Sequence, residues 1–179
     1  MVDAVMASKA DVPEPRFLNP IYHAGFGYDV HRLVMGRPLI LGGIEVPFEK
    51  GLEGHSDADV LLHALIDAVL GAAGMGDIGT HFPSSDPSIE GISSVDMLRQ
   101  VMRMVGEKGW RVENVDGTIV TQQPRLSPHT PKMKKAVAET LSIEGERVNI
   151  KSKTTDGLGF TGTGEGMAAY CVVMLVREA

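Results

Sequence analysis

The sequence predicts a layered α/β (α+β) domain in which a mixed sheet packs against three helices. Short apolar segments typical of strands are interspersed with segments whose apolar residues recur at helical spacing. The 179 residues are 43% hydrophobic and 22% charged, which suits one globular domain with a substantial core. The chain contains no internal repeat or low-complexity tract, so we expect residues 21–179 to form a single domain.

The predicted strands are short apolar segments bounded by turn residues. In the first of them, Gly25 and Gly27 leave room for another backbone or a ligand to approach closely. The dipeptide Gly42-Gly43 divides PLILGGIEVPF into the two arms of a β-hairpin. The predicted strands cover residues 21–31, the two hairpin arms, and residues 110–120, 148–152 and 167–176.

Three segments are predicted to be helices. The first, DADVLLHALIDAVLGAAG, is apolar on nearly every face and is therefore expected to be deeply buried. Ser93 or Ser94 can cap the second helix, which ends at Gly109, and Pro131 opens the third. Two glycine-rich segments, GMGDIGTHFPSSDP and TTDGLGFTGTGEG, are predicted to be loops, and the first is typical of a loop that lines a site.

Composition and charge limit the classes of function. The net charge of −6 and the lack of a basic run argue against a nucleic-acid partner, and no apolar run reaches membrane-spanning length. The single cysteine, Cys171, excludes an internal disulfide and fits a reducing compartment, so we expect a cytoplasmic protein. Residues 1–20 are predicted to be a flexible N-terminal extension, and their acidic side chains argue against a transit peptide.

The sequence GYDVHRL places Asp29 and His31 two residues apart in a predicted strand. Successive side chains of a strand alternate between its two faces, so both of these side chains leave on the same face. Such a pair can be a solvated polar edge, a hydrogen-bonded pair or two ligands of a metal ion. The pair alone does not decide between these possibilities.

His63 is the candidate for a third ligand. It lies among apolar residues of the first predicted helix, where a histidine is most often a core residue satisfied by one hydrogen bond. Ser56 and Asp59 fall along the same side of this helix as His63, and Ser56 or Asp57 can cap it. Together with the strand pair, His63 would make an Asp/His/His site with an open fourth position, which a catalytic Zn²⁺ needs.

Longer motifs follow one another along the chain. They are GYDVHRL, GHSDADVLLHAL, GDIGTHFPSSDP, NVDGTIVTQQPRLSPH and KTTDGLGFTGTGEG. In this order they resemble the motifs of the 2-C-methyl-D-erythritol 2,4-cyclodiphosphate synthase family, and the resemblance runs from about residue 21 to the C-terminus. It implies a ferredoxin-like domain that assembles as a homotrimer with active sites between subunits.

The resemblance also implies an enzyme of the non-mevalonate isoprenoid pathway. In this family the 2-phosphate of a cytidine-diphosphate-linked methylerythritol attacks the β-phosphate, which closes a cyclic diphosphate and expels CMP. Asp29, His31 and His63 match the ligands of Zn²⁺ or another divalent cation, and Asp156 matches a residue that helps to hold Mg²⁺.

The resemblance assigns further residues to the substrate. His55, which would contact the phosphates, and Thr154, which would stabilise the transition state, match catalytic positions. The segment 121–127 matches a cytosine pocket, and the segment 77–79 matches a methylerythritol-binding segment. The full set of matched substrate-binding residues is Asp29, His31, His55, Ser56, Asp77, Ile78, Gly79, Phe82, Pro83, Ser84, Ser85, Asp86, Thr121, Pro124, Arg125, Leu126, Ser127, Lys153, Thr154, Thr155, Asp156, Phe160 and Thr163.

Three positions depart from the family pattern, and two other functions fit parts of the sequence. Asp156 stands where many members have Glu, Thr163 where Arg is frequent, and Ser84 where Asp is usual. A metal-dependent phosphohydrolase would use the same Asp/His ligands with a bound water. A non-catalytic nucleotide- or isoprenoid-binding module would keep the pocket loops without needing the three metal ligands.

Overall fold

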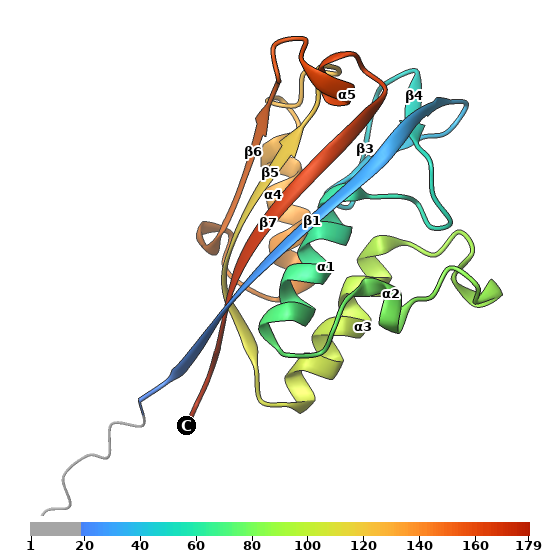
Figure 1. Ribbon diagram of the computed structural model, residues 1–179. Helices are drawn as coiled ribbons and strands as arrows, with labels where there is room; N and C mark the ends of the chain where they lie inside the picture. Colours follow the sequence, from blue (N-terminus) through green and yellow to red (C-terminus); the bar gives the residue numbers. More distant parts are fainter. Residues whose placement is uncertain (1–18) are drawn as a thin grey trace, which may run out of the picture.

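The computed structural model describes residues 19–179, so the predicted extension lies outside the described residues except for its last two positions. The described chain forms a five-stranded sheet in the order β4-β1-β7-β5-β6 and a separate two-stranded hairpin (Figure 1). The sheet consists of β1 (Ile21–Met35), β4 (Lys50–Leu52), β5 (Arg111–Val120), β6 (Val148–Lys153) and β7 (Gly166–Arg177). The hairpin consists of β2 (Leu39–Leu41) and β3 (Ile44–Val46), and Gly42-Gly43 forms its turn as predicted.

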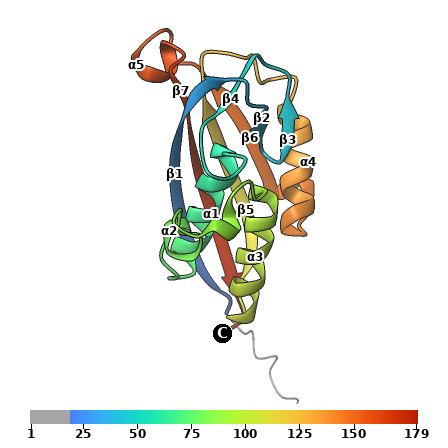
Figure 2. The ribbon, with the colours of Figure 1, turned by 90° about the vertical axis from the view of Figure 1, so that its right-hand side faces the viewer.

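Helices cover one face of the sheet (Figure 2). The long helices are α1 (Val60–Ala72), α3 (Ser94–Glu107) and α4 (Thr130–Leu141), and the short ones are α2 (Ile78–His81) and α5 (Gly159–Gly162). One 3₁₀ turn, Pro87–Ile89, precedes α3, and another, Gly145–Arg147, precedes β6. α1 packs on β1 and β7, α4 packs on β6, and α3 packs on α1. Among the described residues, no helix is long and apolar enough to cross a membrane.

The predicted mixed sheet with three helices is confirmed, but the ferredoxin-like arrangement is not. β5 and β6 are parallel, and the other neighbouring strands are antiparallel. A ferredoxin-like domain follows the order β-α-β-β-α-β, whereas the principal elements here run β-α-α-β-α-β-β. The difference arises because α4 connects the parallel strands β5 and β6, and β7 then inserts between β1 and β5.

The structure corrects the predicted start of the first helix. Ser56 and Asp57 precede the helix, which begins at Val60 and has Asp59 as its N-cap. The Asp59 carboxylate accepts hydrogen bonds from two backbone N–H groups of the first turn, and it also accepts one from Gly43 in the hairpin turn at 2.7 Å. Asp59 therefore joins α1 to the hairpin and lies outside the expected row with His63. Of the two predicted candidates for the cap of α3, Ser93 and Ser94, the structure shows Ser93 in that role.

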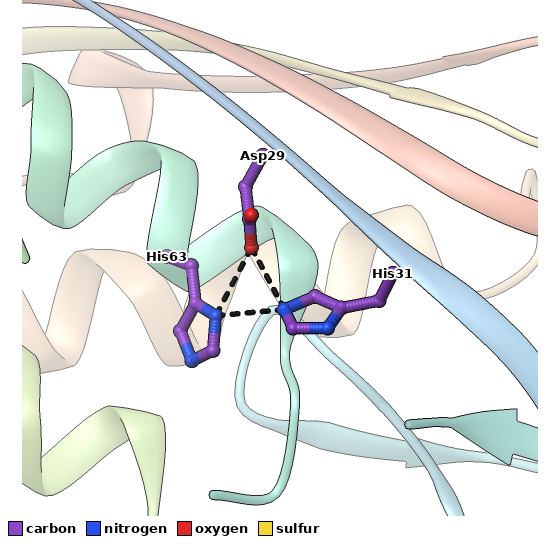
Figure 3. Close-up of side chains that lie close together, drawn as sticks. All are labelled: Asp29, His31 and His63. Atoms are coloured by element: carbon purple, nitrogen blue, oxygen red, sulfur yellow. Dashed lines mark hydrogen bonds and ion pairs between the residues drawn. The ribbon is translucent and has the colours of Figure 1, made fainter. Parts of the chain in front are cut away.

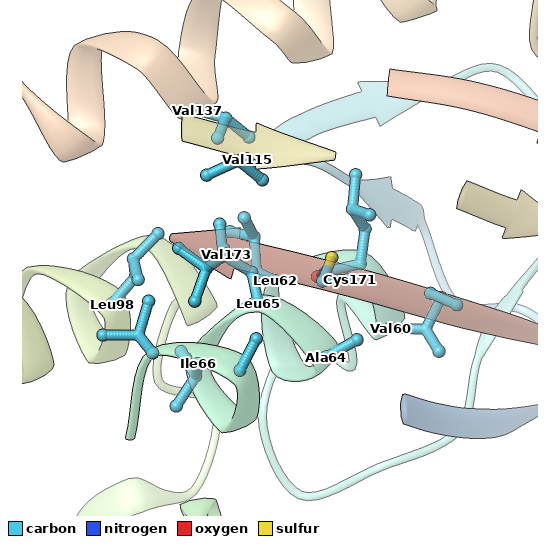
Figure 4. Close-up of a cluster of buried hydrophobic side chains, with 14 of the residues drawn as sticks. Val60, Leu62, Ala64, Leu65, Ile66, Leu98, Val115, Val137, Cys171 and Val173 are labelled. Atoms are coloured by element: carbon cyan, nitrogen blue, oxygen red, sulfur yellow. Dashed lines mark hydrogen bonds between the residues drawn. The ribbon is translucent and has the colours of Figure 1, made fainter. Parts of the chain in front are cut away.

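α1 is apolar on most of its surface because the fold encloses it. Ten of its 13 residues are buried. Val173 of β7 and Val115 of β5 belong to the same buried cluster on the sheet side, and Leu98 of α3 belongs to it on the other side (Figure 4). The predicted deep burial of this helix is confirmed.

Gly25 and Gly27 allow α1 to lie directly against β1. A Cβ atom at Gly25 would lie 1.9 Å from the carbonyl oxygen of Ala68, and one at Gly27 would lie 1.9 Å from that of Ala64. No side chain can be accommodated at such a distance from a backbone atom. The prediction that another backbone approaches these glycines is confirmed, and the approach brings residue 63 of α1 over β1.

We expect Gly27→Ala to destabilise the protein by about 1–3 kcal/mol or more, because the new methyl group forces α1 away from β1. Gly71→Ala is the matched control, since Gly71 is an exposed residue of α1 with open space around it. That substitution is expected to leave the stability unchanged or to raise it by up to about 1 kcal/mol. Chemical denaturation of both variants measures the two effects, and equal effects would contradict the close-packing argument.

Candidate metal centre

Asp29, His31 and His63 converge on one point between β1 and α1 (Figure 3). His31 Nε2 lies 2.9 Å from Asp29 Oδ2, His63 Nδ1 lies 3.0 Å from the same oxygen, and the two nitrogens are 3.0 Å apart. The side chains are mostly buried, with exposed fractions of 25%, 18% and 12% for Asp29, His31 and His63. The prediction that Asp29 and His31 share a face, and that His63 meets them there, is confirmed.

The second nitrogen of each histidine is also engaged. His31 Nδ1 lies 2.6 Å from the backbone oxygen of Glu53, and because a carbonyl only accepts, Nδ1 must donate. A neutral His31 therefore presents the Nε2 lone pair to Asp29. His63 Nε2 lies 3.1 Å from Ser56 Oγ and 3.0 Å from Ser94 Oγ. Outer contacts of this kind orient metal-binding histidines.

The donor set fits a divalent cation. The three ligand atoms lie within 4.8 Å of one another and consist of two imidazole nitrogens and one carboxylate oxygen. Nitrogen and oxygen donors of these kinds bind Zn²⁺ and other divalent transition ions. Without a cation or a proton between them, the converging lone pairs would repel one another, so the geometry favours positive charge at this point.

The surroundings shift the pKa values of both Asp29 and His31. Burial by itself would raise the pKa of Asp29, but the His31 and His63 rings beside it hold that pKa well below its ordinary value. Burial by itself would lower the pKa of His31, but the Asp29 carboxylate outweighs it and raises the pKa. Asp29 is therefore kept as a carboxylate, which is the form that binds a cation.

A second group of predicted residues lines a pocket at the ends of β5 and β6. The cavity has a volume of about 310 Å³. Its lining consists of Thr121, Gln122, Gln123, Pro124, Arg125, Leu126, Ser127, Ser152, Lys153 and Thr154. The segment after β5 meets the end of β6 because the two strands are parallel neighbours, so their C-terminal ends lie at the same edge of the sheet. The structure thus brings together two motifs that are far apart in the sequence.

The loop after β6 is ordered by hydrogen bonds between its own residues. Thr154 Oγ donates to Asp156 Oδ1 at 3.0 Å, and Thr155 Oγ donates to the backbone oxygen of Leu158 at 2.5 Å. Thr163 Oγ donates to Glu165 at 2.7 Å, beside the exposed ring of Phe160. These contacts place the Thr154 and Asp156 side chains next to each other.

The predicted polyol-binding segment begins at α2. Asp77 is exposed and caps this helix, and hydrogen bonds from the Thr80 side chain and backbone lower the pKa of Asp77. Asp67 of α1 accepts a hydrogen bond from Ile78 N–H at 2.7 Å. The contact with Asp67 fixes the segment to the helix that carries His63.

Other predicted residues of this region differ in exposure. His55 is exposed, whereas the neighbouring Ser56 is buried and contacts His63. Phe82 is part of the hydrophobic core, so its ring is largely withdrawn from solvent. Like Asp77, the predicted residues Gly79, Pro83, Ser84, Ser85 and Asp86 are exposed.

Several residues that surround the metal centre are not predicted by the sequence patterns. Those patterns indicate Ser94 and Asp57 only as candidate helix caps. Glu53 contributes through its backbone, which no side-chain pattern reveals. Helical spacing alone could have indicated Asp67, because it lies one turn after His63 on α1.

The metal centre and the pocket lie toward opposite edges of the sheet, in line with each other across the strands. Asp29 of β1 is paired with Ala169 of β7, which is paired with Ile119 of β5, which is paired with Ser152 of β6. Three strand spacings separate the first and last of these residues, or about 14 Å. Within one chain the two groups of residues are therefore separate.

Known proteins match this chain over most of its length. The model of the YgbB family matches residues 22–176. A 2-C-methyl-D-erythritol 2,4-cyclodiphosphate synthase from Geobacter metallireducens is 58% identical over 154 residues, which cover 86% of this chain and 98% of that protein. The synthase of the same name from Caldicellulosiruptor bescii is 56% identical over 155 residues, which cover 87% of this chain and 99% of that protein.

Solved structures agree with these relatives. A 2C-methyl-D-erythritol-2,4-cyclodiphosphate synthase in a CDP-bound form has a TM-score of 0.79 at 36% identity, covering 85% of this chain and 99% of that one. The bifunctional IspDF from Campylobacter jejuni has a TM-score of 0.85 at 40% identity, covering 88% of this chain and 43% of that one. The resemblance noted in the sequence is thereby confirmed, and the chain belongs to the YgbB family.

Proposed function

We propose that residues 21–179 form one cyclodiphosphate synthase domain. The reaction would convert 4-diphosphocytidyl-2-C-methyl-D-erythritol 2-phosphate into 2-C-methyl-D-erythritol 2,4-cyclodiphosphate and CMP. An oxygen of the 2-phosphate forms a bond to the β-phosphorus, and the bond from that phosphorus to CMP breaks, so the enzyme is a phosphorus–oxygen lyase. The observation that carries the proposal is the converging Asp29, His31 and His63 in a chain more than half identical to named synthases.

Asp29, His31 and His63 would hold Zn²⁺ or another divalent cation, and Asp156 would help to hold Mg²⁺ at the diphosphate. Such cations, when bound, polarise phosphoryl oxygens and neutralise charge that develops during the transfer. An acidic chain with a net charge of −6 has particular need of this compensation when it binds a substrate with several phosphates.

The side chains around the metal centre would orient the phosphates. Ser56 Oγ accepts a hydrogen bond from Ala58 N–H at 3.0 Å, so its own hydrogen is free to donate. His55 is exposed beside it and would contact the same groups. Cyclisation competes with hydrolysis, so these residues must hold the 2-phosphate in line with the β-phosphorus and exclude water.

The pocket at the ends of β5 and β6 would bind the cytidine. Two solved relatives were determined with CDP, one of them from Plasmodium falciparum, which supports a cytidine nucleotide as the ligand. Backbone groups of the segment 121–127 would read the base, and Lys153 would attract a phosphate. Thr154 would stabilise the transition state, beside Thr155, Phe160 and Thr163 in the same loop region.

The segment from Asp77 to Gly79 would bind the methylerythritol, with residues 82–86 beside it. Asp77 is a suitable acceptor for hydroxyl groups because its pKa lies below the ordinary value, so it stays ionised. Asp67 would support it by fixing the backbone of Ile78. This assignment places the polyol on the side of the sheet that carries the metal centre.

The functional assembly would be a homotrimer with its sites between subunits. The face of the sheet opposite the helices exposes large apolar side chains, among them Phe26, Tyr28, Tyr170 and Val172. Contiguous apolar surface of this kind is typical of an interface. Neither a nucleic acid nor a membrane is proposed as a partner, and the cytoplasmic location stays a prediction.

Product analysis tests the proposed reaction. With the linear substrate, Zn²⁺ and Mg²⁺, the protein is expected to yield the cyclic diphosphate and equimolar CMP.

His63→Ala is expected to weaken Zn²⁺ binding more than about 100-fold, since loss of an outer-shell partner alone costs 10–100-fold, and to abolish turnover. His23→Ala, which removes an imidazole from the other end of β1, should retain both properties. Linear phosphate products would indicate a phosphohydrolase instead, and CDP binding without any product would indicate a binding module.

The electrostatics of the metal-free site give a second prediction. Asp29→Asn removes the carboxylate that raises the pKa of His31, so burial should then lower this pKa below its ordinary value of 6.5. Because the pKa of His31 is raised in the folded wild-type protein, its protonation stabilises the fold at pH values below the unfolded-state pKa. This stabilisation is lost as the pH rises through the folded-state pKa. An NMR titration of the His31 ring measures the change, with Asp96→Asn as the control because Asp96 pairs with Arg99 on the surface. An unchanged pKa in Asp29→Asn would contradict the assigned cause.

Mixed trimers test the shared site. His31→Ala damages the metal side of a chain, and Thr154→Ala damages the pocket side. After the two inactive variants are dissociated and reassembled together, about a quarter of the interfaces should combine two intact halves and regain activity. Native mass spectrometry can verify that subunits have exchanged. Mixed trimers that form and remain inactive would show that the sites are not shared.

A further inference from the structure

Ser94 and Asp57 form a chain of hydrogen bonds behind His63. Ser94, the first residue of α3, is completely buried, and its Oγ lies 3.0 Å from His63 Nε2. The same hydroxyl donates to Asp57 Oδ1 at 2.5 Å, and the Ser94 backbone N–H donates to Asp57 Oδ2 at 3.0 Å. Asp57 thus receives two hydrogen bonds from one residue, which fixes the orientation of both side chains.

These contacts determine which nitrogen of His63 carries the proton. An ionised carboxylate can only accept, so the single hydroxyl hydrogen of Ser94 is committed to Asp57. Ser94 Oγ can then contact His63 Nε2 only as an acceptor, and Nε2 must carry a hydrogen. A neutral imidazole protonated at Nε2 has its lone pair at Nδ1, the atom that faces Asp29 at 3.0 Å.

Ser56 does not impose this tautomer by itself. Its Oγ lies 3.1 Å from His63 Nε2 and accepts a hydrogen bond from Ala58 N–H. Its own hydrogen can point to Nε2 in one tautomer or away from it in the other, so Ser56 is compatible with both. The selection of the tautomer therefore depends on Ser94 and on the carboxylate behind it.

Asp57 is itself held in place by the backbone. Its N–H donates to the carbonyl oxygen of Ile92 at 3.2 Å, and its carboxylate also accepts from Asp59 N–H at 3.3 Å. The segment before α1 is in this way tied to the segment before α3. The hydrogen-bond chain therefore begins at Asp57, which is held by backbone contacts, and ends at the metal ligand His63.

We propose that Asp57 and Ser94 are positioning residues that hold His63 in the Nε2–H tautomer, with its Nδ1 lone pair directed at the metal site. The proposal deepens the proposed function, because it concerns the same metal site. Without these residues, part of the His63 population would carry its hydrogen on Nδ1, between the ligands. Those molecules would have to change tautomer before a cation could bind.

The test uses metal-free protein with ¹⁵N-labelled histidine at a pH where the imidazoles are neutral. His63 is assigned by comparison with His63→Ala. In the wild-type protein Nε2 should show the chemical shift of a protonated ring nitrogen, and Nδ1 that of an unprotonated one. Ser94→Ala should move the two shifts toward each other and weaken Zn²⁺ binding about 10–100-fold in a competition with a chelator.

Two further variants separate positioning from a structural effect. Ser93→Ala is the matched control, because Ser93 caps α3 through Val95 N–H. It should leave the His63 shifts unchanged and Zn²⁺ affinity within about twofold, far less than loss of an outer-shell partner. Asp57→Ala frees the Ser94 hydrogen to donate to Nε2, so the Nδ1–H form should become more populated than in Ser94→Ala.

The proposal is overturned if Nδ1 of His63 is protonated in the wild-type protein, or if Ser94→Ala behaves like Ser93→Ala in both measurements. Neither measurement requires substrate. A protein that gives the expected shifts and affinities but forms no cyclic diphosphate would therefore refute the proposed function and leave the positioning role intact.

Discussion

The close approach of α1 to β1 is the contact on which the metal centre depends. Two ligands come from β1 and the third from α1, so their separation is set by the distance between the backbones of these elements. Gly25 and Gly27 permit that distance, because any Cβ there would collide with carbonyl oxygens of the helix. The glycines precede Asp29 and His31 on the same face of the strand, so one alternating stripe supplies both the room for the helix and the ligands.

Hydrogen bonds with neighbouring residues fix the orientation of the two histidine ligands. His31 is oriented by the backbone oxygen of Glu53, and His63 is oriented by hydroxyl groups. Among residues 19–179, no further carboxylate contacts the second nitrogen of either histidine. The carboxylate of Asp57 contacts Ser94, and Ser94 contacts His63, so this chain of hydrogen bonds fixes the position of the ring proton. A neutral, oriented imidazole is the form that binds a metal ion.

Local patterns predicted the ligands but not the contacts that orient them. The period of two in GYDVHRL was sufficient to place Asp29 and His31 on one face, and helical burial drew attention to His63. Ser94 is 31 residues from His63, and only the packing of α3 on α1 brings them together. The start of α1 was misplaced because three acidic or hydroxyl residues precede it, and only the structure shows that Asp59 also binds the hairpin turn. The short strand β4 was missed because three residues carry too little periodicity to reveal a strand.

For the proposed reaction, the arrangement of the sheet would make a single chain an incomplete unit. The metal centre belongs to β1 and the pocket to the ends of β5 and β6, with β7 between them. Contact between the metal side of one copy and the pocket side of the next would be head-to-tail, and head-to-tail contacts are satisfied throughout only when they close into a ring. In such a ring the sheet faces that carry Phe26, Tyr28 and Tyr170 would turn inward and be covered. The same closure would thus bury the exposed apolar face and complete each site.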